Sequence, residues 1–365
     1  MRVIAKVGTS SVTHADGTLN ASMFTSLADQ IARLRAGGHE VVLVSSGAVS
    51  AGVAALGLER RPADVGTLQA LAAIGQSRLM ERYNAVFAPH DLVTAQILLV
   101  PHDFGDRQQY LHARQTMLRL LELGVVPIIN ENDAIANDEI RFGDNDRIAA
   151  LVAHSVAADV LVLLTDQEGL YAKDPRANTD AQLMHTVAPD DDLLSVAAGS
   201  AGTARGSGGM ASKLSAARIA SWSGIRTVIA RASRDNVLVD AVDPATTVGT
   251  TFLGRDRQLS ARRLWIAFAA QPVGRVAIDA GAVSAVESRG TSLLSPGVRD
   301  VVGDFSVGDV IDIVGGDGQL VGRGAVAMSS GELASIRGKR AADLADGAST
   351  LVVHRDEMVV LSALR

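Results

Sequence analysis

The fold is decided by a stretch in which the apolar run Val125-Val126-Pro127-Ile128-Ile129 passes directly into Asn130-Glu131-Asn132-Asp133. An apolar run of this length, bounded by polar residues, predicts a buried strand. Open α/β sheets hold their ligands at the carboxyl ends of parallel strands, so we expect these four polar side chains to line a site. Asn and Asp are also ordinary turn residues, and the stretch alone leaves that interpretation open.

Outward from this stretch, short apolar runs alternate with longer segments of helical periodicity. The predicted strands cover 3–7, 41–44, 93–99, 125–129, 160–164 and 227–230, and the predicted helices cover 21–35, 67–88, 111–123, 147–157 and 212–223. Such alternation predicts an α/β fold, with a mostly parallel open sheet sandwiched by helices. The ligand loops should then gather along one edge of the sheet.

The pattern changes after Leu253. A charged stretch without apolar periodicity follows, and short β-prone pieces punctuated by Gly and Asp begin at Gly274. We therefore expect an α/β domain at 1–258, a linker at 259–272 and a small, mostly β domain at 273–365. The length of 365 residues is enough for two domains.

Composition limits the classes of function. The formal net charge of −6 gives no global attraction for nucleic acid. The chain has no cysteine, which excludes disulfides, thiolate metal sites and cysteine nucleophiles and is typical of a reducing compartment. Its apolar runs are only as long as strands, so we expect a cytoplasmic protein with neither a signal peptide nor a membrane span.

Two clusters predict anion-binding loops. Lys6 lies inside the first predicted strand, and the small residues of Gly8-Thr9-Ser10-Ser11 follow it, so their backbone N–H groups can surround an anion. The second cluster is Gly206-Ser207-Gly208-Gly209-Met210-Ala211-Ser212-Lys213, at the start of a predicted helix, where N–H groups and the macrodipole favour phosphate. It is not a Walker loop, because Ser212 precedes the lysine. A solvent-facing lysine and a flexible glycine loop remain the alternatives.

Three further polar clusters follow predicted strands or lie in the loops near them: Ser45-Ser46-Gly47-Ala48, Gly143-Asp144-Asn145-Asp146 and Thr165-Asp166. Together with the two lysines they are typical of phosphoryl transfer, in which positioning and charge neutralisation supply most of the catalysis. A carboxylate acceptor with a pKa of about 4.3 is already ionised at neutral pH. A general base is then unnecessary, in keeping with the lack of a histidine candidate.

The motifs K-V-G-T-S-S, S-S-G-A, P-I-I-N-E-N-D, G-D-N-D, L-L-T-D-Q-E-G-L-Y and G-S-G-G-M-A-S-K resemble, in order and spacing, those of the amino acid kinase family and in particular its glutamate 5-kinases. The part of the chain from about Pro272 resembles the PUA domain that many of these kinases carry. The resemblance implies ATP- and magnesium-dependent phosphorylation of the γ-carboxylate of L-glutamate to L-glutamyl 5-phosphate, the first step of proline biosynthesis.

The resemblance also implies roles for individual residues. Glutamate would be held by Ser46, Gly47, Asn130, Asp133 and Asn145, with Asp133 against the α-ammonium group. ATP would be held by Lys6, Thr165, Asp166 and the run of Ser207, Gly208, Gly209, Met210, Ala211, Ser212 and Lys213. The expected catalytic residues are Lys6, Lys213 and Asp146, with Asp146 orienting the two lysines. No metal ligand is assigned.

Two alternatives remain open at this stage. One is another amino acid kinase, acting on aspartate, acetylglutamate, carbamate or a nucleoside monophosphate. The other is an RNA-binding protein working through its C-terminal part, next to a basic run of Arg255, Arg257, Arg262 and Arg263. The resemblance further leads us to expect a homo-oligomer and feedback inhibition by L-proline, although no residue of the sequence points to either.

Overall fold

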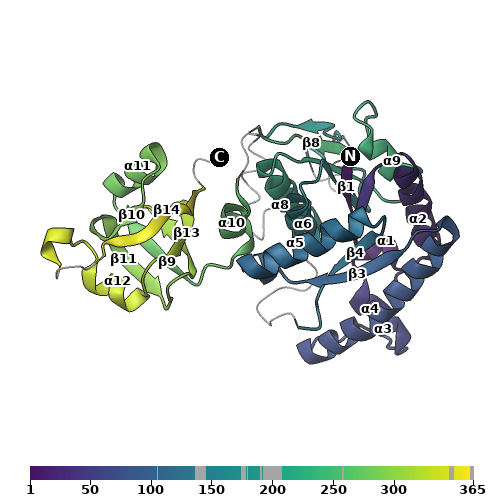
Figure 1. The fold of residues 1–365 in the computed structure, drawn as a ribbon, viewed down its shortest axis with the longest axis horizontal. Coiled ribbons are helices and arrows are strands. Elements are labelled where there is room, and N and C mark those ends of the chain that lie inside the picture. Colours follow the sequence, from purple (N-terminus) through teal and green to yellow (C-terminus); the bar gives the residue numbers. More distant parts are fainter. Residues whose placement is uncertain are drawn as a thin grey trace. The chain divides into compact units, whose positions relative to one another are not determined.

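The structure, a computed structural model, describes residues 1–104, 106–135, 145–173, 178, 180–189, 191, 208–256, 259–344 and 349–361. Contacts divide the chain into two compact units. The first comprises Met1–Asp103 and Gln108–Gln258, and the second comprises Phe104–Arg107 and Leu259–Arg365. Each unit has its own sheet (Figure 1).

The first unit contains an eight-stranded sheet in the order β3-β4-β2-β1-β5-β7-β8-β6. Its strands are β1 (Arg2–Val7), β2 (Glu40–Val44), β3 (Thr94–Leu99), β4 (Val126–Glu131), β5 (Val160–Thr165), β6 (Thr186–Val187), β7 (Arg226–Arg231) and β8 (Thr250–Phe252). Neighbouring strands are parallel except β7 and β8. The predicted mostly parallel sheet is confirmed. The sequence did not predict β6 and β8, which are too short to show a period.

Helices cover both faces of this sheet. They are α1 (Thr9–Val12), α2 (Ala21–Ala36), α3 (Ala48–Ala55), α4 (Val65–Phe87), α5 (Arg107–Glu122), α6 (Asn145–Ser155), α8 (Gly208–Trp222) and α9 (Val237–Val242), with 3₁₀ turns η1 (Ala88–His90) and η2 (Pro101–Phe104). Successive strand residues point to opposite faces, yet β4 and β5 are buried at every position, so neither face is open to water. The five predicted helices are confirmed, whereas the short helices α1, α3 and α9 were missed.

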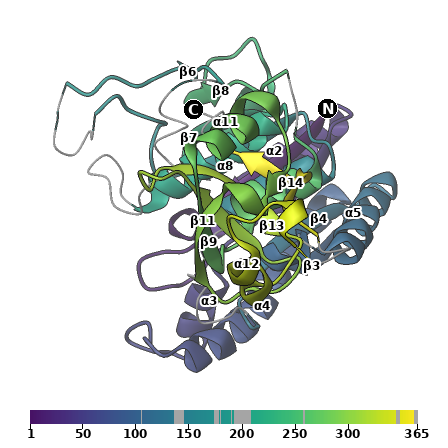
Figure 2. The same ribbon diagram turned by 90° about the vertical axis from the view of Figure 1, so that its left-hand side faces the viewer.

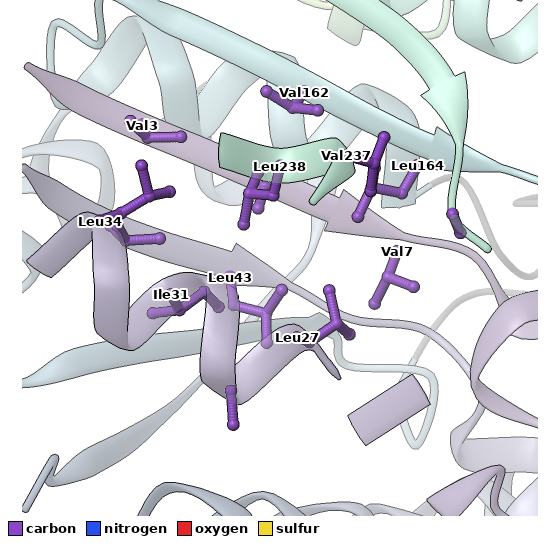
Figure 3. Close-up of a cluster of buried hydrophobic side chains, with 14 of the residues drawn as sticks. Val3, Val7, Leu27, Ile31, Leu34, Leu43, Val162, Leu164, Val237 and Leu238 are labelled. Atoms are coloured by element: carbon purple, nitrogen blue, oxygen red, sulfur yellow. The ribbon is translucent and has the colours of Figure 1, made fainter. Parts of the chain in front are cut away.

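The core of the first unit is aliphatic. On one face, side chains of β1, β2 and β5 pack against α2 and α9, as Figure 3 shows for Val3, Val7, Leu43, Val162 and Leu164 with Leu27, Ile31, Leu34, Val237 and Leu238. Each of these side chains is 6% exposed or less. Complete burial of a side chain of this size contributes about 1.5–3 kcal/mol, so this layer fixes the strands that carry the site.

Four neighbouring strands deliver their following loops to one edge of the sheet. They lie in the order β4, β2, β1, β5 and all run parallel. Their last residues are Glu131, Val44, Val7 and Thr165. Adjacent strands are about 4.8 Å apart, so the residues that follow these ends form a short row.

Helices α3 and α4 cross unusually closely. A Cβ atom at Gly75 of α4 would lie 1.8 Å from the carbonyl oxygen of Ala48, and one at Gly52 of α3 would lie 2.1 Å from that of Leu71. Only glycine permits backbones to approach to this extent. The crossing holds α3 next to the end of β2, because α3 begins directly after Gly47.

The second unit has a six-stranded sheet in the order β10-β14-β13-β12-β9-β11. Figure 2 labels β9, β11, β13 and β14 of this sheet. The elements of the unit are β9 (Gly274–Ile278), α11 (Ala280–Arg289), β10 (Leu293–Leu294), η4 (Ser295–Gly297), β11 (Val298–Gly303), β12 (Val310–Val314), β13 (Leu320–Val326), α12 (Ser330–Ile336), η5 (Ala341–Asp343) and β14 (Leu351–Val360). A separate core forms around Ile278, Ile313 and Leu333. The mostly β character is confirmed, and α11 and α12 are additions to it.

Residues of the expected linker form helical structure. Helix α10 (Ala261–Leu264) begins with Ser260 as its N-cap and continues into the π-helical turn η3 (Trp265–Ala269). Leu264 and Ile266 are fully buried. The segment is grouped with the second unit. Across the described ranges, no helix is both long and apolar enough to cross a bilayer.

Candidate active site

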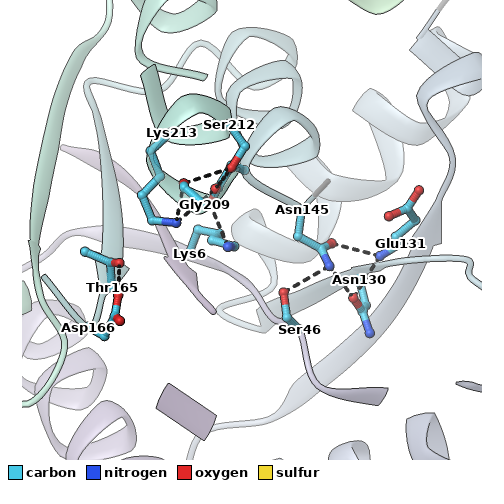
Figure 4. A network of polar contacts seen from close by, with 11 residues as sticks. Lys6, Ser46, Asn130, Glu131, Asn145, Thr165, Asp166, Gly209, Ser212 and Lys213 are labelled. Atoms are coloured by element: carbon cyan, nitrogen blue, oxygen red, sulfur yellow. Dashed lines mark hydrogen bonds and ion pairs between the residues drawn. The ribbon is translucent and has the colours of Figure 1, made fainter. Parts of the chain in front are cut away.

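A buried ion cluster lies where β1 ends. The ammonium nitrogen of Lys6 is 2.6 Å from Oδ1 of Asp146, and that of Lys213 is 3.1 Å from Oδ2 of the same carboxylate (Figure 4). The three residues are 5%, 8% and 3% exposed. An ammonium group is costly to bury unless it meets a counter-charge, so Asp146 explains how both lysines are tolerated there. The structure thus brings the two lysines together at one carboxylate, and their catalytic role stays a prediction.

Helix geometry places the members of this cluster. Asp146 lies in the first turn of α6, where the macrodipole favours a carboxylate. Lys213 lies on α8, and its side chain reaches back to donate to the carbonyl oxygen of Gly209 at 3.2 Å, as helical side chains lean toward the N-terminus. Ser212 adds a hydrogen bond of 2.7 Å from its hydroxyl to Oδ2 of Asp146.

The electrostatics of Asp146 follow from these contacts. Burial raises the pKa of its carboxyl group, but the charges of Lys6 and Lys213 and the hydrogen bonds of Lys6 and Ser212 outweigh burial, so the pKa lies below its ordinary value. Asp146 is therefore ionised at neutral pH. The cluster then carries two positive charges and one negative charge, which suits an anionic ligand.

A second buried cluster consists of amides and a hydroxyl. Asn145 donates from Nδ2 to Oγ of Ser46 at 3.1 Å and to Oδ1 of Asn130 at 3.0 Å. Its Oδ1 accepts from the backbone N–H of Glu131 at 3.0 Å. Asn130, Asn145 and Ser46 are 1%, 2% and 6% exposed. Asn130 was expected after the strand, but it lies within β4, which continues to Glu131.

Asp133 is a buried carboxylate two residues after the end of β4. It is 7% exposed, and its Oδ1 has no hydrogen-bond partner among the described residues. Burial raises the pKa of Asp133 to about 6, although the charge of Arg61 opposes the shift. An unsatisfied buried carboxylate is a natural site for a cationic group of a ligand.

Gly47 sets the course of the chain between Ser46 and α3. Its φ of 103° lies in the left-handed region, which glycine enters without penalty. A Cβ at this position would also lie 3.0 Å from Cγ2 of Val12. Gly47 thus allows the backbone to turn tightly beside Ser46.

The two clusters meet at the start of α6. Asn145 belongs to the amide cluster and Asp146 to the lysine cluster, and consecutive Cα atoms are only about 3.8 Å apart. Figure 4 shows the two groups next to each other. A molecule held by the amides would therefore lie within reach of an anion held by the lysines.

Thr165 and Asp166 lie at the end of β5, on the other side of β1 from β2 and β4. The hydroxyl of Thr165 donates to Oδ1 of Asp166 at 3.0 Å. Thr165 is buried, whereas Asp166 is exposed. Along the sheet edge the order is therefore the amide cluster, the lysine cluster and the Thr165-Asp166 pair.

The glycine-rich run has a different form from the one expected. Ser207 lies outside the described residues, as do Gly143 and Asp144. Gly208, Gly209, Met210 and Ala211 are already in α8, which begins at Gly208 rather than at the predicted position 212. Gly208 to Ala211 thus belong to the first turn of the helix. The unpaired N–H groups of a helix N-terminus favour an anion.

Gln76 is a polar contact that sequence reasoning missed. It lies on the buried side of α4 with Leu79 and Tyr83 and is 9% exposed. Its Oε1 accepts from Nδ2 of Asn130 at 2.8 Å. A glutamine among apolar neighbours at helical spacing was the only signal in the sequence.

The described residues contain no group of three or more His, Cys, Asp or Glu side chains that could hold a metal ion. Phosphate oxygens of a bound nucleotide commonly provide ligands for Mg²⁺.

Comparison with known families fits this arrangement. The model of the amino acid kinase family matches residues 1–231, and the PUA domain model matches residues 274–347. The chain belongs to the amino acid kinase family. The first match spans the sheet edge and both buried clusters.

Relatives within the amino acid kinase family match almost the whole chain. Proteins named glutamate 5-kinase are 47% identical in Thermobifida fusca (strain YX), 46% in Janthinobacterium sp. (strain Marseille) and 44% in Thermoanaerobacter sp. (strain X514). Each alignment covers 99% of this chain and between 93% and 98% of the relative. The relatives therefore share both the kinase part and the PUA part.

Proposed function

We propose that this chain transfers the γ-phosphoryl group of ATP to the γ-carboxylate of L-glutamate, forming L-glutamyl 5-phosphate in the first step of proline biosynthesis. The observation that carries the proposal is the order of groups along the sheet edge: amide cluster, lysine cluster, then Thr165-Asp166. This order provides neighbouring places for an acceptor, a transferring phosphoryl group and a nucleoside. The glutamate 5-kinase relatives support the choice of acceptor.

The acceptor would bind between Asp133 and the amide cluster. In this proposal the buried carboxylate of Asp133 pairs with the α-ammonium group of glutamate, which replaces the missing hydrogen-bond partner of its Oδ1. Ser46, Asn130 and Asn145 offer neutral polar groups to a carboxylate, and Gly47 gives access to the backbone. The γ-carboxylate is already anionic at neutral pH, so no side chain needs to remove a proton.

The phosphoryl group would lie between the lysines. One oxygen of the γ-carboxylate forms the new bond to phosphorus, the bond to the bridging oxygen breaks, and ADP leaves with the electron pair. Lys6 and Lys213 neutralise the charge on the moving group, and Asp146 keeps both ammonium groups aligned. Preorganised charges of this kind need no rearrangement during the reaction.

ATP and magnesium fit the residues that are present. Lys6, Lys213 and the N-terminal turn of α8, from Gly208 to Ser212, would hold the phosphates, and Thr165 with Asp166 would hold the nucleoside side. We assign Ser207, which precedes this turn in the sequence, to the phosphates as well. Magnesium, when bound, adds neutralising charge on the phosphates, mainly through phosphate oxygens. The pair of ammonium groups and the helix N-terminus together suit a polyphosphate.

The nearest alternative is a different acceptor. Acetylglutamate lacks the α-ammonium cation and would leave the buried Asp133 unpaired, at an expected cost of several kcal/mol. Carbamate and nucleoside monophosphates lack that cation as well. Aspartate keeps it but is one methylene shorter, so its carboxylate would not reach as far toward the lysines.

An acceptor panel tests the proposal. The full-length chain is incubated with ATP, magnesium and hydroxylamine, and ADP and hydroxamate are measured for glutamate, aspartate, acetylglutamate, carbamate and UMP. We expect equal amounts of ADP and hydroxamate with glutamate and background amounts with the others. A larger kcat/KM with any other acceptor would overturn the assignment.

The alternative of RNA binding gains no support from the basic run. Arg255 stacks over Trp222 at 4.1 Å, and Arg262 pairs with Glu357 at 2.8 Å. Arg263 donates to the carbonyl oxygen of residue 355 at 3.0 Å. Arg257 lies outside the described residues. These three arginines are engaged within the chain, so they do not form a free basic patch.

On the resemblance alone, we extend the proposal to a cytoplasmic homo-oligomer that L-proline inhibits, with residues 273–365 as its PUA-like domain. Analytical ultracentrifugation tests the assembly, and a titration of glutamate-dependent turnover with L-proline tests the inhibition. A monomer at assay concentration would refute the homo-oligomer. Turnover that is unaffected by millimolar proline would refute the inhibition by L-proline.

A further inference from the structure

We propose that Gln76 is a positioning residue for the acceptor pocket: it fixes which way the amide of Asn130 points, and through Asn145 it makes the hydroxyl of Ser46 a hydrogen-bond donor to the acceptor carboxylate. This inference rests on the proposed function. It concerns a residue of α4 that belongs to none of the sequence motifs.

The contact that begins the chain of hydrogen bonds is buried and short. Oε1 of Gln76 accepts from Nδ2 of Asn130 at 2.8 Å, and the two residues are 9% and 1% exposed. An amide has a donor end and an acceptor end, and a partner at one end decides the orientation of the other. Gln76 therefore turns Oδ1 of Asn130 toward the remaining members of the cluster.

The orientation then passes from one amide to the next. Oδ1 of Asn130 accepts from the backbone N–H of Glu131 at 2.9 Å and from Nδ2 of Asn145 at 3.0 Å. If the amide of Asn130 were reversed, its NH₂ group would face both of these donors. Because such a donor-to-donor arrangement is unfavourable, the bond to Gln76 also selects the orientation of Asn145.

Ser46 is the end of this chain of hydrogen bonds. Its Oγ accepts from Nδ2 of Asn145 at 3.1 Å, which leaves the hydroxyl proton available for another acceptor. A carboxylate of the substrate is an acceptor and cannot donate. The hydrogen-bond directions that Gln76 imposes thus leave Ser46 as a donor, which is what the carboxylate of the proposed substrate requires.

Helix α4 is held firmly enough for this role. Gly75, which precedes Gln76, lies against α3 so closely that a Cβ would be 2.6 Å from the backbone nitrogen of Gly52. Tyr83 lies about two helical turns further along the same side, and its hydroxyl is 2.7 Å from Oγ of Ser45. One helix therefore supports both Asn130 and the residue before Ser46.

Two substitutions separate the polar role from simple packing. Gln76→Met keeps the approximate size and removes the acceptor, so we expect the KM for glutamate to rise about tenfold, as for loss of a hydrogen bond to a buried amide. Gln76→Glu keeps an acceptor oxygen, and its KM for glutamate should stay within about threefold of wild type. For both variants the KM for ATP should be unchanged within about twofold. If Gln76 only filled space, Gln76→Glu would raise the KM for glutamate more than Gln76→Met, because it buries a charge.

Gln30→Met is the matched control. Gln30 is a buried glutamine of α2, 3% exposed, and its Oε1 accepts from the N–H of Leu238 at 2.8 Å. It should lower the melting temperature but leave the KM for glutamate unchanged, because it contacts neither cluster. The comparison separates general destabilisation from an effect on the pocket.

The experiment distinguishes a wrong role for Gln76 from a wrong proposed function. If the wild type shows no glutamate-dependent turnover, the proposed function is wrong and the role of Gln76 falls with it. If the wild type is active and Gln76→Met has a wild-type KM for glutamate, only the role of Gln76 is refuted. If Gln76→Met does not fold, the test rests on Gln76→Glu. A tenfold rise in the KM for glutamate of folded Gln76→Glu would also refute the positioning role of Gln76.

Discussion

At the scale of single residues, the burial of Asp133 costs stability at a position that we propose for substrate binding. Its carboxylate is buried without a full set of partners, and burial raises its pKa to about 6 from the ordinary 3.8. The folded state therefore holds the proton more tightly than the unfolded state. The stability that this proton gives is fully present below about pH 3.8 and is lost as the pH rises through about 6.

Asp133→Asn should therefore stabilise the free protein at neutral pH. A shift of about two pKa units corresponds to about 3 kcal/mol, so we expect a gain of about 1–3 kcal/mol in the free energy of unfolding at pH 7.5 and almost none at pH 4. Denaturant unfolding at both pH values measures it. The exposed Asp235→Asn is the control, with no expected change. An equal difference at both pH values would contradict this explanation.

The same carboxylate predicts how the wild type responds to pH. Protonated Asp133 cannot pair with an ammonium group, so the KM for glutamate should rise about tenfold between pH 7 and pH 5. In Asp133→Asn the KM should already be high at pH 7 and change little with pH. Steady-state kinetics at saturating ATP check both statements. A wild-type KM that is flat across this range would remove Asp133 from the pocket.

The sequence motifs contain most of the charged residues of the candidate site, but they do not indicate which residues support them. Lys6 and Lys213 both pair with the carboxylate of Asp146, and their catalytic role stays a prediction. Gln76 was missed because a lone glutamine on a helix has no characteristic spacing. Its role depends on which strand lies opposite α4, and that contact joins residues 54 positions apart in the chain.

At the scale of elements, the crossing of α3 and α4 supports the residues that we propose to hold the acceptor. Gly75→Ala would place a methyl group 1.8 Å from the carbonyl oxygen of Ala48, so the helices must separate. We expect a loss of about 3 kcal/mol or more in unfolding free energy, together with a raised KM for glutamate, because α3 begins beside Ser46. Thermal unfolding and kinetics measure the two effects.

Gly66→Ala provides the control within the same helix. A Cβ there would meet only Oδ1 of Asp64, at 3.9 Å. Replacing an unconstrained helical glycine with alanine usually stabilises by about 0.4–1 kcal/mol. If Gly75→Ala behaved like Gly66→Ala, the close crossing would be unimportant.

Strands were easier to predict than helix boundaries, for physical reasons. Most of the strands of the parallel sheet are buried on both faces, so they appear as continuous apolar runs, and the six strands that were predicted lie within two residues of their observed bounds. The short strands β6 and β8 were missed. Helix α8 begins at Gly208, four residues before the predicted start, because glycine and small residues carry no helical signal. Helix α3 consists of small and apolar residues without a polar face, so it shows no helical period.

At the scale of the whole molecule, the chain has two hydrophobic cores. One core joins β1, β2 and β5 to α2 and α9, and the other lies within the second sheet. The change of sequence pattern near residue 253 indicated this division, because alternating strands and helices give way to short β-prone pieces. The sequence did not reveal that residues 261–269 are helical.

Two cores predict two calorimetric unfolding transitions for the full chain. All candidate site residues lie in the first unit, so ATP with magnesium should raise the temperature of only one transition. Gly75→Ala should lower the temperature of that same transition. A single transition that shifts as a whole would show instead that the units unfold together.

We propose that Lys6 and Lys213 together neutralise a phosphoryl group on its way to glutamate. The most direct test is the turnover of Lys213→Ala and Lys6→Ala at saturating glutamate and ATP, with the exposed Lys173→Ala as the control. We predict that each site variant loses at least about 10²–10³ in kcat with folding largely intact, whereas the control keeps wild-type turnover. Wild-type turnover in either folded site variant would contradict the account.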